Sequence, residues 1–217
     1  MRWLSLVLLL AACAGLPKEQ RSASRPHVIW IVADDLGYGD LGFTGCEDIP
    51  TPHLDRLAAS GVVCADGHVT ASVCAPSRAG LITGRHQQRF GFECNLGSNK
   101  DGLLPEVPTA AGLLGAAGYE CVAVGKWHLG YLEENHPLAV GFEHFTGLRG
   151  GSRSYFPKLE KRPSKAQRIE RDGVEVAESK FEYVTDLFTE ESETVSGWYR
   201  FSEGPARAAD EIGRAHV

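Results

Sequence analysis

Hydrophobic and polar positions change period several times along this chain, and the changes mark its expected elements. His27 to Ala33 (HVIWIVA) is an almost continuous apolar, β-branched run. Such a run is typical of a strand buried on both faces of a mostly parallel sheet. Val62 to Val69 and Tyr119 to Val124 also indicate strands. Helical signals predict helices between the strands and after them, over residues 52–60, 76–83, 109–117 and 181–191.

Pro52 to Ser60 has the clearest helix boundaries. Thr51 is placed to cap the first turn, Pro52 suits the first helical position, and Gly61 follows the last. Strands that alternate with helices predict a layered α/β fold.

The pattern weakens toward the C-terminus. From about Gly141 the chain is rich in glycine, aromatic and charged residues, and 158–180 is expected to be a surface excursion. Residues 192–217 show no helical or strand period. The last seven residues, EIGRAHV, match a translated sequencing adaptor, so we expect the natural protein to continue beyond the family region. A disordered natural tail is the alternative.

The N-terminus predicts export. Residues 1–13 combine Arg2 with a short apolar run, which suits a signal peptide and is too short for a membrane-spanning helix. The sequence LAAC ending at Cys13 resembles a bacterial lipobox, which predicts a lipid anchor through Cys13, with cleavage after Ala14 as the alternative. Residues 14–25 are interpreted as a polar tether. The expected location is the periplasm or the membrane of a bacterium, as a lipoprotein.

Composition excludes some classes of protein. The 217 residues are 43% hydrophobic and 23% charged, as in a soluble globular domain, and the formal net charge of −6 argues against a nucleic-acid partner. The six cysteines show no zinc-ligand spacing. Export permits disulfides among Cys46, Cys64, Cys94 and Cys121, but buried free thiols are an equal alternative.

The most informative motif begins at Cys74. The sequence Cys74-Ala-Pro-Ser-Arg78 is followed by Ala-Gly-Leu-Ile-Thr-Gly-Arg85. This segment resembles the signature of the type I sulfatases, C-x-P-S-R with a T-G-R ending. Arg78 lies four residues after Cys74, so a helix places both on one face, where a guanidinium fork can hold anionic oxygens. We also expect free backbone N–H groups at this helix start to favour an anion.

The resemblance implies a chemical role for Cys74. In the family this cysteine is converted to formylglycine by a formylglycine-generating enzyme, which would be a partner of this chain. The hydrated aldehyde carries two hydroxyl groups: one attacks the sulfur, and the other later expels sulfate. A covalent step divides a hard displacement into two easier ones. The alternative for an isolated cysteine is a buried structural thiol.

Asp34 and Asp35 follow the first expected strand. Ligand sites of open α/β sheets collect at the carboxyl ends of strands, and two adjacent carboxylates repel each other unless a cation lies between them. Hard oxygen ligands suit Ca²⁺, with Mg²⁺ as the alternative. The resemblance implies that Asp34, Asp35 and the group made from Cys74 bind this metal. A solvated turn is the alternative interpretation.

The segment from Gly118 to His128, GYECVAVGKWH, resembles the second sulfatase signature. Cys121 stands where the family usually has Ser or Thr. Lys126 and His128 are two residues apart, so in an extended chain they face the same side. The resemblance implies that Lys126 contacts the sulfate and that His128 contacts the formylglycine hydroxyl. The alternatives are a solvated lysine and a structural histidine.

The resemblance covers residues 26–191, interpreted as the N-terminal part of a sulfatase catalytic domain. It implies an alkaline-phosphatase-like fold with a large, mostly parallel central sheet flanked by helices. In the family further metal ligands lie later in the chain, so we expect the 217 residues alone to bind metal poorly, to fold unstably and to lack turnover.

The predicted function is hydrolysis of an organic sulfate ester, with carbohydrate sulfate as the expected substrate. One alternative is a phosphonate monoester or phosphodiester hydrolase of the same superfamily. Another is a non-catalytic envelope protein that binds sulfated glycans, although the net acidity disfavours strong binding of polyanions.

Overall fold

The computed structural model describes residues 25–95, 102–160 and 163–198, in two compact units that divide after Asp35. The predicted signal peptide with Cys13 and most of the predicted tether lie outside the described residues, as does the chain after residue 198. No helix in the described ranges is long and apolar enough to cross a membrane.

The first unit, described over residues 25–35, differs from its predicted structure. Residues 27–33 form no strand, and the side chains of Val28 and Ile31 are each 61% exposed. A strand needs a hydrogen-bonded neighbour, and an apolar one needs cover on its faces. The described residues pair no strand with this run, so its hydrophobic pattern is not expressed as a strand.

The second unit begins with α1 (Pro52–Ser60), which has the predicted bounds. Thr51 precedes it and is buried, but its hydroxyl does not cap the helix. It accepts a hydrogen bond from the Gly42 N–H at 2.8 Å and donates one to Asp55 Oδ1 at 3.0 Å. Residues 62–69, expected as a strand, are irregular here.

Four strands form one sheet in the order β1-β2-β3-β4. β1 (Val122–Lys126) and β2 (His144–Leu148) are parallel, whereas β3 (Ile169–Arg171) and β4 (Val174–Glu175) continue antiparallel. β1 begins and ends slightly later than predicted, and the other three strands were not predicted. The sheet is therefore small and mixed and differs from the large, mostly parallel sheet that was predicted, whereas the α/β class itself agrees with the prediction.

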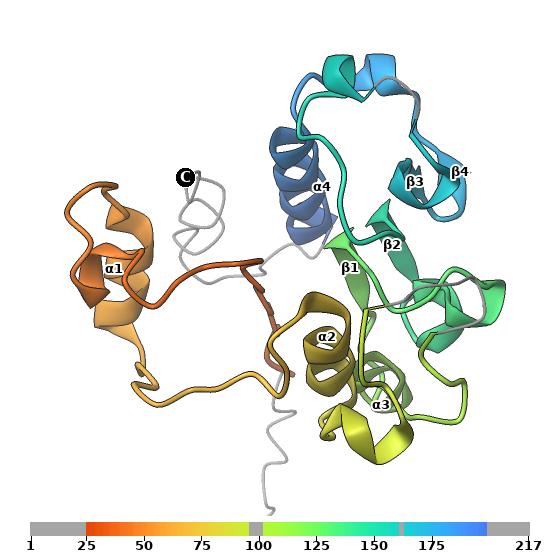
Figure 1. Cartoon of the computed structure of the whole chain (residues 1–217), viewed down its shortest axis with the longest axis horizontal. Helices are drawn as coiled ribbons and strands as arrows, with labels where there is room; N and C mark the ends of the chain where they lie inside the picture. The colour runs from red at the N-terminus through yellow and green to blue at the C-terminus, as the bar shows by residue number, and fades with distance from the viewer. Residues whose placement is uncertain (1–24, 96–101, 161–162, 199–217) are drawn as a thin grey trace, which may run out of the picture. The chain divides into compact units, whose positions relative to one another are not determined.

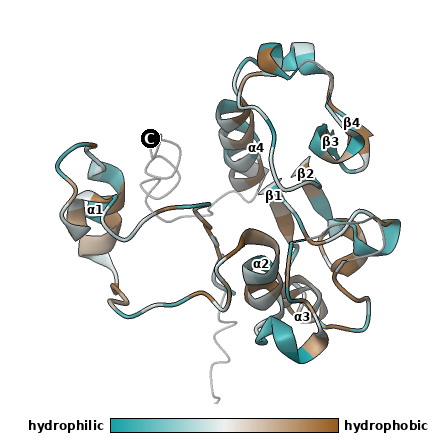
Figure 2. Cartoon of the chain, in the orientation of Figure 1, coloured by the Kyte–Doolittle hydropathy of each residue, from teal (hydrophilic) through white to brown (hydrophobic). Residues whose placement is uncertain are grey.

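Helices cover both faces of this sheet, with α4 (Val184–Trp198) on one and α2 (Cys74–Thr83) and α3 (Ala110–Ala116) toward the other (Figure 1). Figure 2 colours β1 as a hydrophobic strand between these layers. Side chains alternate along β2. Phe145 packs into a core with α2, and Leu148 packs into a second core with α4, whose members are Leu148, Ile169, Val184 and Leu187.

Two helices, α3 and α4, and one close contact between β1 and β2 position the parts of the candidate site. Thr109, predicted as the first helical residue, instead caps α3, because its Oγ1 accepts from the Gly112 N–H at 3.0 Å. The helix predicted at 181–191 is α4, which continues past residue 192 to Trp198. Gly147 pairs with Gly125, and a Cβ on Gly147 would overlap the Gly125 carbonyl oxygen. The absence of a side chain therefore lets β1 and β2 meet at this point.

Candidate active site

The Cys74 motif forms the start of α2. Cys74 is the first helical residue, is partly buried, and follows Val73, whose side chain cannot cap the helix. Ser77 donates its hydroxyl hydrogen to the Ala71 carbonyl at 2.6 Å, which ties the approach loop to the first turn. Asn95, from a loop beyond the helix, lies close to Cys74, with 3.5 Å between its Oδ1 and the cysteine Sγ.

The first turn of α2 offers an anion fewer donors than the sequence suggests. The Ala75 N–H donates to Asn95 Oδ1 at 3.1 Å, and the Ser77 N–H donates to the Val73 carbonyl at 3.2 Å. Pro76 has no N–H. The Ser77 bond is the first bond of the helix itself, so among the first four backbone groups that of Ala75 is used and that of Pro76 is absent. Fewer donors therefore face an anion at this helix start than the sequence suggests.

Arg78 connects the two sequence motifs. Its Nη1 donates a 2.6 Å hydrogen bond to the carbonyl oxygen of Lys126, 48 residues later. A hydrogen bond from a charged donor contributes about 1.5–3 kcal/mol. The contact sets the α2 helix against the carboxyl end of β1, so the cysteine motif and the GKWH motif belong to one site.

Trp127 and His128 continue the pairing of β1 with the chain after β2. The Trp127 N–H donates to the Leu148 carbonyl at 2.9 Å, and the His128 N–H to the Arg149 carbonyl at 3.2 Å. His128 is only 6% exposed and has a positive φ of 59°. This left-handed conformation is sparsely populated by residues other than glycine. The extended-chain argument for a face shared with Lys126 therefore does not hold, and their common role remains a prediction.

Gly151 lies directly against the His128 ring. A Cβ on Gly151 would be 2.5 Å from His128 Cε1 and 2.7 Å from Nε2, closer than real contacts allow. The loop that carries Gly151 is held in place, because the Gly150 N–H donates to the Ala166 carbonyl at 2.6 Å. The backbone after β2 thus packs against one side of the His128 ring.

Arg153, in the same loop, has a structural role. Its side chain is 3% exposed, makes a two-point ion pair with Glu178 at 2.7 and 3.1 Å, and lies over the Phe181 ring. Its Nη1 also donates to the Gln167 carbonyl at 3.1 Å. These contacts use the guanidinium inside the protein.

The predicted metal ligands lie in different units. Asp34 and Asp35 belong to the first, where Asp35 has a positive φ of 63°, and Cys74 belongs to the second. Within the described ranges, no group of three His, Cys, Asp or Glu side chains is arranged to hold a metal ion. The two carboxylates are hard oxygen ligands suited to Ca²⁺ or Mg²⁺. Either ion takes more oxygen ligands than these two groups supply. The metal site stays a prediction.

No disulfide joins the cysteines of the described residues, and of the four thiols expected to be paired or buried only Cys121 is buried, whereas Cys46 is half-buried and Cys64 and Cys94 are exposed. Cys121, at the unusual position of the second motif, lies 3.6 Å from the Ala111 carbonyl oxygen. Burial, and then the charge of Glu143, raise the pKa of its thiol. Cys121 is therefore a packing residue at the base of β1.

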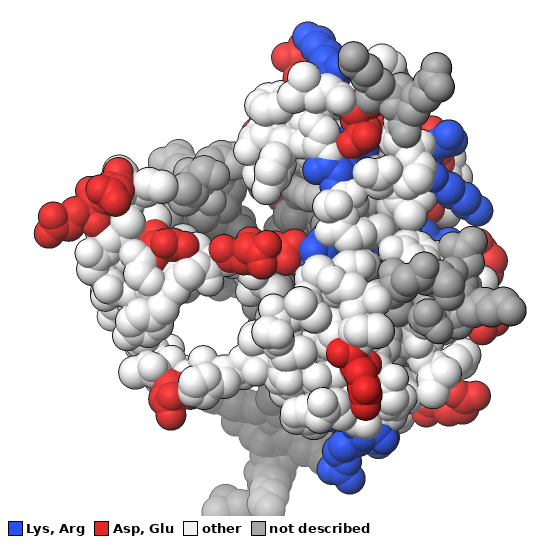
Figure 3. Space-filling view, in the orientation of Figure 1, with Lys and Arg blue, Asp and Glu red and all other residues white. Residues whose placement is uncertain are grey.

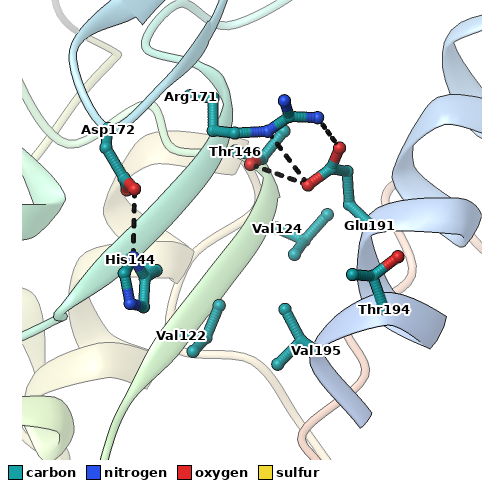
Figure 4. A pocket seen from close by; sticks show the side chains of 9 residues that line it. All are labelled: Val122, Val124, His144, Thr146, Arg171, Asp172, Glu191, Thr194 and Val195. Carbon is teal, nitrogen blue, oxygen red and sulfur yellow. Dashed lines mark hydrogen bonds and ion pairs between the residues drawn. The ribbon is translucent and has the colours of Figure 1, made fainter. Parts of the chain in front are cut away.

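A separate hollow of about 290 Å³ lies between the sheet and α4 (Figure 4). At one side His144 Nδ1 is 3.0 Å from Asp172 Oδ2, and Arg171 pairs with Glu191. The hydrogen bond with Asp172 raises the pKa of His144. None of the predicted site residues lines this hollow.

Acidic and basic residues are interspersed on the face drawn in Figure 3, without one continuous basic area among the described residues there.

Comparisons with known proteins agree with the motifs. A family profile described as Sulfatase matches residues 26–194. Arylsulfatase G of Rattus norvegicus is 42% identical over 160 residues, which is 68% of this chain and 30% of that protein. Arylsulfatase A of Homo sapiens is 45% identical over 145 residues, 65% of this chain and 28% of that protein. The chain thus spans about 30% of the length of these relatives.

Solved structures support the same relationship. The crystal structure of Ps i-CgsB in complex with k-i-k-neocarrahexaose matches with a TM-score of 0.71 and 35% identity, covering 80% of this chain and 42% of that one. A structure solved in complex with its substrate, D-glucosamine-2-N,6-O-disulfate, matches with a TM-score of 0.63 and 26% identity. It covers 80% of this chain and 31% of that one.

Sequence analysis identified the residues that its motifs contain and missed two that support them. Asn95 lies close to Cys74 and Gly151 lies close to His128, yet neither belongs to a periodic segment. Both contacts join residues more than 20 positions apart. No sequence spacing would have predicted them.

Proposed function

Because the chain belongs to the sulfatase family, we propose that it is the N-terminal part of an enzyme that hydrolyses sulfate esters of carbohydrates. The observation that carries this proposal is the hydrogen bond from Arg78 to the Lys126 carbonyl, which joins both family motifs in one site. The resemblance to structures solved with a neocarrahexaose and a glucosamine disulfate supports a carbohydrate substrate.

In this proposal Cys74 is converted to formylglycine. Water supplies the aldehyde oxygen, sulfur leaves as H₂S, and two electrons and two protons pass to an external acceptor such as dioxygen. When hydrated, the group supplies one hydroxyl that attacks the sulfur and a second whose deprotonation releases sulfate and restores the aldehyde. Overall, water and the sulfate ester give an alcohol and hydrogen sulfate.

The remaining residues act on charge and protons. Lys126 offsets the negative charge of the sulfuryl oxygens, and Arg78 adds a second positive charge beside residue 74. His128, held by Gly151 on one side, moves the proton of the reacting hydroxyl. Arg78 also has a structural duty, because one of its donors is committed to the Lys126 carbonyl.

We further propose that Asp34, Asp35 and residue 74 bind Ca²⁺, or Mg²⁺, together with ligands from outside this chain's 217 residues. The metal would draw sulfate oxygen charge toward itself. In the same proposal residues 27–33 form a strand of a larger, mostly parallel sheet in the complete protein. A run that is about half exposed would gain stability from burial of its apolar surface.

Sequencing the source locus downstream of the codon for Glu191 comes first, followed by expression of the complete reading frame with a formylglycine-generating enzyme. We expect turnover of an aryl sulfate and of sulfated oligosaccharides to exceed that of a phosphate diester. Cys74→Ala is expected to lower kcat/KM by at least about 10³-fold. The matched control is Cys94→Ala, because Cys94 is exposed and its thiol is also free.

A preference for the phosphate diester would favour the related phosphodiester hydrolase instead. Full activity of Cys74→Ala would contradict the nucleophile assignment altogether. Removal of divalent cations with a chelator is expected to abolish turnover, and addition of Ca²⁺ or Mg²⁺ is expected to restore it. Binding of sulfated glycans without turnover would indicate the non-catalytic alternative.

We propose export with a lipid anchor through Cys13. Labelled palmitate is expected to enter the protein made in a bacterial host, and Cys13→Ala is expected to abolish the label. An unlabelled, exported wild-type protein would support plain signal cleavage instead.

A further inference from the structure

Asn95 reaches the start of α2 from a loop 20 residues beyond it. One atom, its side-chain Oδ1, lies 3.1 Å from the Ala75 nitrogen and 3.5 Å from Cys74 Sγ. Because Val73 at the cap position provides no acceptor of its own, the amide of Asn95 takes the role of a capping side chain. The same oxygen therefore serves the helix backbone and the side chain of residue 74.

The chemistry of an amide oxygen suits this double contact. It has two lone pairs, so it accepts from the Ala75 N–H and from a donor on residue 74 together. A thiol is a weak donor, and its hydrogen bonds are long, whereas a hydroxyl donates strongly at shorter distance. A carboxylate in this position would accept equally well, but its charge would repel an anionic substrate.

We propose that Asn95 is a positioning residue for the reacting group at position 74, and that its Oδ1 accepts a hydrogen bond from one hydroxyl of the hydrated formylglycine. The inference rests on the proposed function, because it requires conversion of Cys74. Holding one hydroxyl in this direction fixes the rotation about the Cα–Cβ bond. It thereby directs the other hydroxyl and favours the hydrated form over the free aldehyde.

A purely structural role for Asn95, as a cap of α2, predicts a different set of results. Loss of a cap destabilises the helix and lowers activity through unfolding. It does not change the balance between aldehyde and hydrate. The rate at which an aminooxy probe labels the protein reports on that balance, because the probe reacts with the free aldehyde.

The experiment uses the complete reading frame coexpressed with a formylglycine-generating enzyme, with conversion of residue 74 measured by mass spectrometry. Asn95→Ala is expected to label about 2- to 10-fold faster than wild type at equal conversion, because one hydrogen bond to the hydrate is lost. Its kcat is expected to fall more than its KM changes. Glu93→Gln is the matched control, since Glu93 is an exposed residue of the same loop.

Asn95→Asp separates hydrogen bonding from charge. We expect it to label at the wild-type rate, because the acceptor is retained, but to lose kcat/KM at neutral pH. That loss is expected to diminish as the pH falls toward the ordinary pKa of an aspartate, about 4. Recovery at low pH would not follow from a weakened helix.

Unchanged labelling by Asn95→Ala, with activity that follows thermal stability, would reduce Asn95 to a cap and overturn the proposal. Faster labelling in a protein without sulfatase turnover would uphold Asn95 and contradict the proposed function. A residue 74 that stays cysteine despite coexpression would overturn both.

Discussion

Gly151 determines where the His128 ring can lie. An alanine there would place its Cβ within 2.7 Å of two ring atoms, so the ring or the loop must move. We expect Gly151→Ala to cost about 1–3 kcal/mol of unfolding free energy, as overpacking does, and to lower kcat of the complete enzyme by about 10-fold or more. Urea denaturation and steady-state kinetics measure the two effects.

Gly67→Ala is the matched control for that substitution. A Cβ on Gly67 would meet its nearest neighbour, the Cys64 carbonyl oxygen, at 3.6 Å, which is an ordinary contact. Its effect on stability should be within about 0.5 kcal/mol. Equal effects of the two substitutions would contradict the idea that the glycine makes room for the histidine.

At the scale of single residues, the sequence predicted those candidate site residues that lie inside its two motifs. Arg78 and Lys126 belong to separate motifs, and the structure joins them through a backbone carbonyl. The partners that hold these residues escaped prediction, because Asn95 and Gly151 act through positions set by folding. A motif specifies chemical identity, whereas the geometry around it depends on long-range contacts.

At the scale of elements, the irregular segment after β2 contains a buried ion pair that contributes to its stability. Arg153 is buried and pairs with Glu178, which is 30% exposed at its side chain. Glu178→Gln leaves a buried guanidinium without a counter-charge, so we expect a loss of about 2 kcal/mol in unfolding free energy. The value is below that for a fully buried pair, because solvent reaches the carboxylate.

The pair between Arg168 and Glu175 provides the control. Its side chains are 45% and 55% exposed. Glu175→Gln is therefore expected to cost less than about 1 kcal/mol in the same denaturant titration. If both substitutions prove equally mild, the Arg153 side chain does not secure the loop.

Helices were easier to predict than strands because their signals are local. Proline, a capping position and a terminal glycine predicted α1 with its observed bounds. β2 contains Gly147, which is a poor indicator of a strand, and it forms through pairing with β1. The turn Asp172-Gly173 between β3 and β4 has positive φ at both residues and is a local hairpin signal.

For the molecule as a whole, His144 and Asp172 predict a pH dependence of stability. The hydrogen bond that Asp172 accepts from His144, opposed by burial and aided by the charges of Asp172, Glu120 and Glu143, raises the pKa of His144 above 6.5. Burial alone would raise the pKa of Asp172, but the Phe145 N–H and His144 together lower it below 3.8.

The signs of these shifts define the window. A raised histidine pKa contributes stability that is complete below about 6.5 and is lost as the pH rises through the folded-state value. A lowered aspartate pKa contributes stability above about 3.8 that is lost as the pH falls through its folded-state value. Both contributions are therefore complete between about pH 4 and 6.5.

Urea denaturation across pH 3–9 checks this expectation for the complete protein. His144→Gln is expected to remove the decrease that the wild type shows above about pH 6.5, and to reduce the acid-side contribution of Asp172, because His144 helps to lower that pKa. An unchanged difference between wild type and variant over the whole range would show that the pair does not titrate with folding.

The bond from Arg78 to the Lys126 carbonyl also has a consequence for the order in which the chain folds. It closes a segment of 48 residues, and the length-dependent part of that closure costs about 3 kcal/mol in chain entropy. Local helices such as α2 form without that cost, but the junction of the two motifs requires it. We therefore expect Cys74 to approach Lys126 and His128 late in folding, so that a partly folded chain carries both motifs without the contact that joins them.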